Sequence, residues 1–452
     1  MHCYLKNNTS MKRILFLFAL NIVAYSVKAQ ITVSGGIYQN TTWTLANSPY
    51  LVTGSIVVFP EKILTIEPGV EILIDNQTSS SIYIETRGTL NCIGTDLSPI
   101  TIHALYDTLN PVAWQGFICT SSQGGVLNAD RFHISNAHTP FAYETALTNY
   151  QYINCVFSHC FQAITVANSV NLQNCQFIDN EVGVYGWSYF AINNCLFKDN
   201  TTSIFAYATT VQLTNCNFID NQIGVVFAAY VFDLMTISDC QFLNNELALG
   251  YPNNGVVRNC LFSQNITAMQ SASTCEIFDN EFLYNELALE ASVNTVIHDN
   301  KINNNFGGLF ISNVSLVQDS PLIYNNEICG NINYNVNNNT NMNYSLLTNC
   351  FCALDSSEIE QYLIDGYDDI TKGLINYFPT ISSYTNPVSD YLTIFQEAAI
   401  EQIRIYSAKG QLFTIEAIGS KVFDLQFLSP GIYFVQGIQG DSITSTIKII
   451  KQ

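Results

Sequence analysis

The stretch NNCLFKDN, residues 193–200, contains the short unit from which most of this chain is built. The same phrase, an asparagine or aspartate followed by Cys-x-Phe, begins at Asn154, Asn174, Asn194, Asn215, Asp239 and Asn259. The cysteines of successive copies are 20, 20, 21, 24 and 20 residues apart. A unit of this length is too short to be a domain, so each copy is one coil of a stacked repeat.

The spacing continues beyond the last of these cysteines, with asparagine in the cysteine position. Asp279-Asn280-Glu281-Phe282 and Asp299-Asn300-Lys301-Ile302 keep the 20-residue step, and Asn325-Asn326-Glu327-Ile328 is a weaker ninth copy. A polar pair follows each copy and predicts a corner, because asparagine and aspartate favour turns. These pairs are Asp179-Asn180, Asp199-Asn200, Asp220-Asn221, Asn244-Asn245, Gln264-Asn265, Tyr284-Asn285 and Asn304-Asn305. A second apolar stretch comes next, so we expect two strands and two corners in each coil.

The period and composition select the kind of repeat. Helical repeats need about 33 to 45 residues, and leucine-rich repeats need leucines at fixed offsets that this chain does not have. A parallel β-helix remains, in which residues two apart on a strand share a face. Cys175 and Phe177 are therefore expected to stack inside the coil on Cys195 and Phe197, with coils roughly 4.8 Å apart.

Composition bounds the function. Only 12% of the 452 residues are charged, and the net charge is −20, with 16 basic against 36 acidic residues. Asparagine takes the place of charge, which predicts a surface rich in neutral amides. Binding to nucleic acid or to anionic polymers requires clustered lysine and arginine, so any polymer partner is expected to be neutral.

The N-terminus predicts an export signal over residues 1–29 whose true start is Met11. Lys12 and Arg13 precede an apolar run from Ile14 to Tyr25, and Ala29 with Val27 supplies a cleavage site. No later run reaches the 18 or so apolar residues of a membrane span, so the mature chain is expected to be exported and to have no transmembrane segment.

Fourteen cysteines in an exported chain usually indicate a disulfide framework. Here the six cysteines of the Cys-x-Phe copies are expected to stack as one column inside the coils, so packing alone explains their presence. Equivalent residues on neighbouring parallel strands also lie farther apart than the 3.5 to 4.5 Å between Cβ atoms that a disulfide prefers. We therefore expect free, buried thiols in the column. Cys329, Cys350 and Cys352 lie outside it, and a disulfide among them stays open.

The residues before the regular array form less regular coils in this interpretation. Residues 30–150 contain short apolar stretches such as Leu64 to Ile74 (LTIEPGVEILI) and Gly88 to Ile102 (GTLNCIGTDLSPITI), and Trp114-Gln115-Gly116 follows them. With the array over residues 151–352, these motifs resemble those of secreted right-handed parallel β-helix proteins of the Bacteroidetes type. That resemblance implies an all-β fold; it does not imply one activity, because the architecture supports many.

The end of the array needs a cover, because an open last coil exposes its interior and its strand edges. Residues 353–380 are expected to form this cap and a linker. Ser356 or Ser357 is suited to begin a short helix over residues 358–363, which Gly366 would end.

The last segment, residues 384–452, alternates short apolar strands with turns, and predicts a small β-sandwich. It is similar to the C-terminal sorting domain of the type IX secretion system. The matching motifs contain Asn386, Pro387, Gly410, Pro430, Gly431, Tyr433, Lys448 and Lys451. The resemblance implies that the outer-membrane translocon is a partner and that the protein is exported through the periplasm to the cell surface or the medium.

The best catalytic candidates are acids at equivalent positions of adjacent coils. Asp279 and Asp299 are one coil apart, Glu281 is matched with Lys301, and His298 precedes Asp299. Two carboxylates at about 5 to 5.5 Å would suit a retaining glycosidase. Corner geometry alone also explains an aspartate at this position, since asparagine occupies it in most other coils. Neither a zinc spacing nor a calcium repeat is recognised, and we expect no cofactor and no metal.

Aromatic residues recur in the loops after the second apolar stretch and are candidates for a carbohydrate-binding strip, because sugars stack on such rings. They are Tyr185, Trp187, Tyr189, Tyr207, Tyr230 and Tyr251. The sequence thus favours a non-catalytic, adhesin-like rod that binds a neutral polysaccharide. The alternative is a polysaccharide-degrading enzyme, a glycoside hydrolase or lyase, whose site contains Asp279, Glu281, Asp299 and His298.

Overall fold

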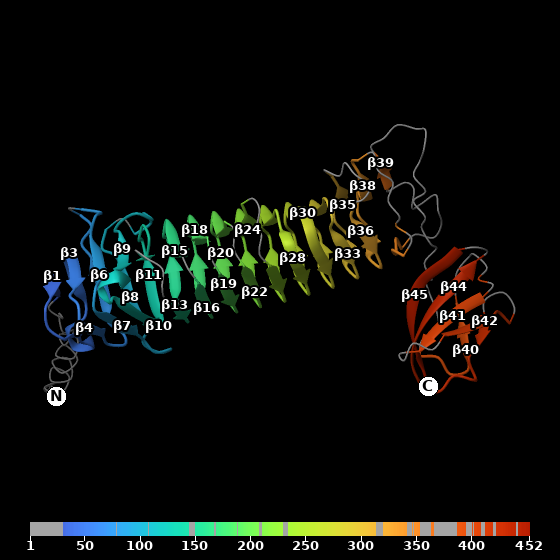
Figure 1. The fold of residues 1–452 in the computed structure, drawn as a ribbon, viewed down its shortest axis with the longest axis horizontal. Coiled ribbons are helices and arrows are strands. Elements are labelled where there is room, and N and C mark those ends of the chain that lie inside the picture. The colour runs from blue at the N-terminus through green and yellow to red at the C-terminus, as the bar shows by residue number, and fades with distance from the viewer. Residues whose placement is uncertain are drawn as a thin grey trace, which may run out of the picture.

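A computed structural model shows an elongated parallel β-solenoid of about 12 turns, followed by a small all-β unit (Figure 1). The expected fold class is therefore confirmed. The structure describes residues 30–77, 79–106, 108–143, 150–166, 169–187, 189–207, 210–228, 234–312, 320–340, 346, 348–352, 363–365, 387–394, 400, 402–407, 412–418, 422–439 and 442–452. The proposed export signal, residues 1–29, lies outside this part of the chain.

Each regular coil contains three short strands, one more than the sequence pattern predicted. One coil consists of β16 (Val170–Gln173), β17 (Gln176–Ile178) and β18 (Val182–Gly186). These strands pair in parallel with β19 (Phe190–Asn193), β20 (Leu196–Lys198) and β21 (Thr202–Ala206) of the next coil. The prediction of two strands was wrong because the first two are separated by a corner of only two residues, which an apolar pattern does not resolve.

The same three-strand order extends along the solenoid (Figure 1). The other first strands are β10 (Val126–Asp130), β13 (Tyr150–Ile153), β22 (Val211–Thr214), β25 (Met235–Ser238), β28 (Asn253–Arg258), β33 (Val296–His298) and β36 (Leu322–Tyr324). The other second strands are β11 (Phe132–Ser135), β14 (Val156–Ser158), β23 (Asn217–Ile219), β26 (Gln241–Leu243), β29 (Leu261–Ser263), β31 (Glu281–Leu283), β34 (Lys301–Asn303) and β37 (Glu327–Cys329). The other third strands are β12 (Phe141–Tyr143), β15 (Gln162–Val166), β24 (Ile223–Phe227), β27 (Leu247–Gly250), β32 (Leu287–Ala291), β35 (Gly307–Ile311), β38 (Tyr334–Asn338) and β39 (Leu363–Asp365), and β30 (Thr267–Phe278) serves as third strand of one coil and first of the next.

The opening coils are less regular, as expected. Their strands are β1 (Ile31–Ile37), β2 (Thr41–Trp43), β3 (Tyr50–Val58), β4 (Ile63–Ile66), β5 (Glu71–Ile74), β6 (Tyr83–Thr86), β7 (Thr89–Ile93), β8 (Ile100–Ala104) and β9 (Gly116–Cys119). Two short 3₁₀ turns, η1 (Leu45–Asn47) and η2 (Ser121–Gln123), interrupt them. Parallel pairing continues from these strands into the array through β7 with β10 and β8 with β11.

The corners have the backbone conformation that their residues favour. The residue that precedes each cysteine, or the asparagine that replaces it, has φ between 52° and 58° from Asn154 to Asn325. The residue before the second corner's asparagine is also left-handed, with φ from 54° at Asp179 to 61° at Gln264. Asparagine and aspartate tolerate this region better than most residues. The corner prediction is therefore confirmed.

Two predicted columns of side chains fill the interior. The rings of Phe157, Phe177, Phe197, Phe218, Phe242, Phe262 and Phe282 stack with centroids 4.7 to 5.0 Å apart and planes within 11° of parallel. The cysteines at positions 155, 175, 195, 216, 240 and 260 are buried and free, as expected. The two columns place matched residues of successive coils on one another and so fix the register of the stack.

A ladder of buried asparagines follows the second corner. Asn180, Asn200, Asn221, Asn245, Asn265, Asn285, Asn305 and Asn331 are at most 2% exposed. From Asn180 to Asn305, the backbone N–H and the side-chain Nδ2 of each residue both donate to Oδ1 of the next, at 2.9 to 3.0 Å. The expected amide-rich surface is thus only half correct, because one asparagine of each pair points inward.

A second ladder continues the thiol column. Asn280, Asn300, Asn326 and Asn349 repeat the same pattern, with side-chain bonds of 2.8 to 3.0 Å between neighbours. The backbone N–H of Cys260 donates to Oδ1 of Asn280 at 2.9 Å and joins the two columns. Asparagine can replace cysteine here because it supplies the acceptor that the neighbouring N–H needs.

The structure adds a disulfide and a strand to what the sequence predicts for the end of the array. Cys329 and Cys352 form a disulfide with Cα atoms 5.5 Å apart, although they occupy neighbouring coils. The sequence left a disulfide among Cys329, Cys350 and Cys352 open, and the structure pairs Cys329 with Cys352. Residues 353–362 of the expected helix lie outside the described residues, and Leu363 begins β39, which pairs with β38.

The C-terminal unit consists of two small antiparallel sheets that share one core. One contains β40 (Tyr391–Thr393) and β43 (Val422–Asp424); the other has the order β42 (Leu412–Glu416), β41 (Gln402–Ser407), β44 (Gly431–Gln439) and β45 (Ser442–Lys451). Short strands separated by turns were predicted for this segment, and the structure has them. Within the described residues, no helix has the length and apolar character required to cross a membrane.

Candidate functional sites on the solenoid surface

Four aromatic rings form a cluster on the outer surface of two adjacent coils. Tyr185 on β18 lies opposite Phe205 on β21, with ring centroids 5.4 Å apart. Trp187 packs edge-on against Tyr185 at 5.0 Å and lies 6.4 Å from Tyr207. Trp187 and Tyr207 are 50% and 47% exposed. We call these four residues the aromatic cluster; it offers ring faces and edges to a ligand from solvent.

The structure brings only some of the predicted strip together. Tyr189 is close in sequence to the aromatic cluster, but its hydroxyl donates to Gln212 at 2.9 Å, one coil further along. Tyr251 lies at a left-handed corner after β27 and is 49% exposed. Tyr230 falls outside the described residues. The cluster proper therefore contains Tyr185, Trp187 and Tyr207 of the predicted set, together with Phe205.

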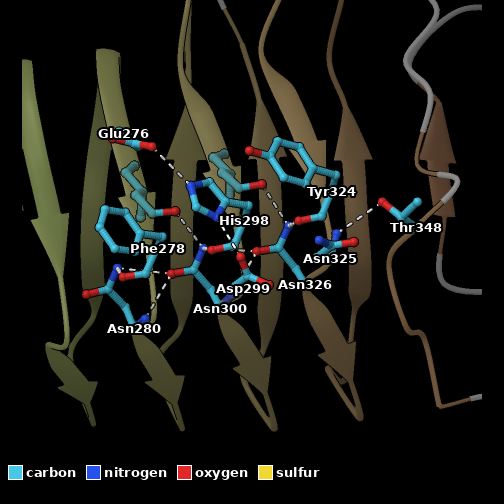
Figure 2. A network of polar contacts seen from close by, with 12 residues as sticks. Glu276, Phe278, Asn280, His298, Asp299, Asn300, Tyr324, Asn325, Asn326 and Thr348 are labelled. Atoms are coloured by element: carbon cyan, nitrogen blue, oxygen red, sulfur yellow. Dashed lines mark hydrogen bonds and ion pairs between the residues drawn. The ribbon is translucent and has the colours of Figure 1, made fainter. Parts of the chain in front are cut away.

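The second candidate site is centred on His298, at the end of β33. Its ring stacks between Phe278 and Tyr324, with centroids 5.1 and 5.0 Å away and planes within 3° of parallel (Figure 2). Nδ1 contacts the Asp299 carboxylate at 2.7 Å, and Nε2 contacts Glu276 at 3.2 Å. Each face of the ring and each nitrogen therefore has a protein contact, and the side chain is 14% exposed.

The neighbouring acids occupy positions that the geometry of the coil explains. Glu281 on β31 accepts a hydrogen bond from Lys301 on β34 at 2.8 Å, as the register predicted. This bond raises the pKa of the Lys301 amine. Asp279 and Asp299 are exposed and share φ of 55°, the geometry that the corner requires. Acidic and basic side chains are therefore present near His298, and an ion pair or the geometry of a corner accounts for each of them.

Two members of these sites were not identified from the sequence. Phe205 occupies a half-buried outward position on β21, and a strand phenylalanine gives no signal that distinguishes it from a core residue. Glu276 reaches His298 from the preceding coil and lies on the part of β30 that serves as a first strand, which the pattern did not separate from the second strand. Counting 20 residues back from His298 gives Phe278, and Glu276 lies two residues before it on the same face of that strand, which is the signal that could have located Glu276.

The sorting motifs occupy the C-terminal sheets. Tyr433 on β44 is buried, and its hydroxyl donates to the carbonyl of Ser429 at 2.9 Å, which fixes the turn containing Pro430 and Gly431. Lys448 lies opposite Phe434 in the sheet. The described part of the motif also includes Pro387, which is exposed, and Lys451, which is 6% exposed and lies 3.8 Å from Asp390. Asn386 and Gly410 lie outside the described residues.

The fold and the tail together define an exported β-solenoid protein. Residues 382–452 match the family described as the secretion system C-terminal sorting domain, two residues earlier than the predicted start. The protein is therefore exported by the type IX secretion system to the cell surface or beyond it. No curated protein and no solved structure matches the chain.

Proposed function

We propose that the solenoid is a non-catalytic, carbohydrate-binding rod that the type IX secretion system delivers to the outside of the cell. The observation that carries this proposal is the aromatic cluster on β18 and β21. Its rings lie 5.0 to 6.4 Å apart. Tyr185 and Phe205 lie on the paired strands, and the exposed Trp187 and Tyr207 directly follow those strands. Sugars present apolar C–H faces that pack on such rings.

The groups around the cluster favour a neutral ligand. Thr165 lies opposite Tyr185 on the preceding coil, and its hydroxyl bonds to Gln162 at 3.3 Å. Val226 lies opposite Phe205 on the next coil. Hydroxyl and amide groups of this kind pair with sugar hydroxyls, whereas the net charge of −20 opposes anionic polymers.

A polysaccharide-degrading enzyme is the second candidate, and the arrangement of Glu276, His298 and Asp299 favours it. A histidine between two carboxylates is suited to proton transfer. In this chain both ring nitrogens are already bonded and both ring faces are covered, so a substrate would have to displace a protein contact. This supports a structural role for His298, with Asp279 and Glu281 beside it in the stack.

The proposal is tested by screening the full exported chain on an array of neutral glycans. The matched variants are Trp187→Ala, which removes one exposed ring of the cluster, and Tyr106→Ala, which removes an exposed ring from an opening coil. We expect a defined set of glycans to bind wild type and Tyr106→Ala equally. Trp187→Ala should bind the same set at least about 10-fold more weakly.

Two results would count against this assignment. One is the absence of binding to every neutral glycan, and the other is equal binding by wild type and Trp187→Ala. Release of new sugar ends from a bound glycan, abolished by His298→Ala or Asp299→Asn, would support the enzyme instead.

A further inference from the structure

Three cysteine side chains meet on the outside of the solenoid near its C-terminal end. The sulfur atoms of Cys329, Cys350 and Cys352 all lie within 4.8 Å of one another. Cys329 and Cys352 form the disulfide, and Sγ of Cys350 lies 3.8 Å from Sγ of Cys352. Among the free cysteines that the structure describes, Cys350 alone is not fully buried. We call these three residues the thiol cluster.

The strand register explains why the three sulfurs meet. The segment at Cys350 pairs in parallel with β37, through bonds from Cys350 N–H to the Asn326 carbonyl at 2.7 Å and from Ile328 N–H to the Cys350 carbonyl at 2.8 Å. Ile328 and Phe351 point inward, at 0% and 3% exposure. Alternation then places Cys329, Cys350 and Cys352 on the outer face together with Glu327, which is bridged to Cys350.

We propose that the thiol cluster is a metal site that is open when the disulfide is reduced, and that its three thiolates then hold one divalent ion of the zinc type. A tetrahedral zinc with Zn–S bonds of about 2.3 Å has its sulfurs about 3.8 Å apart. The separation of Cys350 and Cys352 is 3.8 Å on the present backbone. Thiolates are the ligands that zinc and related borderline ions prefer.

The surroundings supply the rest of the site. Cys352 is exposed, so a water molecule can reach the fourth position of a tetrahedral ion. The Glu327 carboxylate lies beside Cys350 and adds negative charge that attracts a cation. Burial, together with this charge, raises the pKa of the Cys350 thiol.

The disulfide and the metal are alternative states of the same sulfurs. A dithiol reductant delivers two electrons and two protons to the Cys329–Cys352 bond, becomes a disulfide itself, and leaves three thiols in the cluster. Binding of the ion then releases three thiol protons to solvent and forms three metal–sulfur bonds. Reducing conditions therefore favour the metal-binding state, and oxidising conditions favour the disulfide.

The experiment titrates the full chain, reduced and then freed of reductant without oxygen, with Co²⁺ as a spectroscopic probe. We expect thiolate-to-cobalt absorption that saturates at one ion per chain and disappears on addition of Zn²⁺. Cys350→Ser keeps the disulfide pair for folding and should bind the reduced-state ion at least about 10-fold more weakly. Cys275→Ala removes a buried thiol outside the cluster and should bind as wild type does.

A second arm makes the test independent of the reduction step. The chain is produced in a reducing cytoplasm with added zinc, purified with reductant present, and its metal content is measured. A reduced chain that retains its β-sheet circular dichroism and takes up neither ion overturns the proposal, as does equal cobalt binding by Cys350→Ser. A reduced chain that folds only when zinc is present supports it, and one that folds under neither condition overturns it.

Discussion

Asn221 donates a side-chain N–H to Oδ1 of Asn245, one coil further along the solenoid, at 2.9 Å. The same amide also donates to the Phe197 carbonyl of the preceding coil at 3.1 Å. Its own Oδ1 accepts the backbone N–H of Asn200 at 2.9 Å. One side chain thus joins three coils and satisfies backbone groups that the corner leaves without a partner in the sheet.

Replacing a ladder asparagine should therefore destabilise the whole stack. Asn221→Ala leaves the Asn200 N–H and the Phe197 carbonyl buried without this partner. We expect a cost of roughly 1–3 kcal/mol for each stranded group, measured as a lower urea midpoint. Asn171→Ala, at an exposed position of β16, is the matched control and should change stability by less than about 0.5 kcal/mol. Equal effects of the two variants would mean that the ladder is not a source of stability.

The phenylalanine column predicts a second, independent loss. Phe218→Ala removes a fully buried ring that stacks on Phe197 at 4.9 Å and on Phe242 at 4.7 Å. A cavity of this kind should cost about 3–5 kcal/mol of unfolding free energy. Phe218→Leu fills most of the space and should cost clearly less. A result in which both variants unfold at the wild-type urea concentration would contradict the buried column.

The fold was predictable because a single period repeats in the sequence. Cysteine and phenylalanine recur two residues apart in successive units of 20 residues or so. Among the known repeat architectures, this pattern is compatible only with a parallel β-helix. The burial and stacking of these side chains agree with that architecture. The asparagine ladder was missed, although the sequence contains its signal. The first residue of each corner pair varies among Asp, Asn, Gln and Tyr, whereas the second is always asparagine. An invariant amide beside a variable one indicates an inward position.

A partly buried ion pair in an opening coil predicts an acid-sensitive contribution to stability. Glu85 on β6 accepts two bonds from Arg87, at 2.6 and 2.8 Å, and one from Thr120 at 2.8 Å. The Arg87 bond is the main cause that lowers the pKa of the Glu85 carboxyl, although burial opposes it. The stabilisation is therefore complete above the unfolded-state pKa of about 4.3 and is lost as pH falls through the lower folded-state value.

Glu85→Gln removes that ionisation and is expected to lower stability at pH 7 by about 1.5–3 kcal/mol. It should also reduce the further loss of stability that wild type shows below about pH 4. Urea unfolding at a series of pH values measures both effects. Parallel acid profiles for wild type and variant would contradict the assigned role of Glu85.

Removal of the C-terminal unit is expected to change the localisation of the protein and to leave the folding of the solenoid intact. A chain that lacks residues 382–452 should accumulate inside the cell envelope, because the translocon reads this domain. Fractionation of cells that carry the type IX system, with detection of the solenoid, measures the change. Trp187→Ala keeps the tail and should reach the surface as wild type does. Equal surface amounts of truncated and full-length chain would contradict a sorting role.

The candidate sites were less predictable than the fold, for a physical reason. Periodicity specifies which residues point inward, and leaves open which outward residues of adjacent coils converge. Tyr185, Trp187 and Tyr207 converge because their strands are in register, whereas Tyr251 lies at a corner further along. For His298, the sequence grouped Asp299 with it in the candidate set. It did not identify the stacking rings of Phe278 and Tyr324, which lie on the first strands of the adjacent coils.

The most direct test of the proposed function is calorimetric titration of the full exported chain with one neutral polysaccharide, with new sugar ends measured in the same samples. We expect saturable binding, a loss of at least about 10-fold in affinity when Trp187→Ala is combined with Tyr207→Ala, and no release of sugar ends. Unchanged affinity in the double variant, or release of sugar ends that depends on His298, would contradict the account.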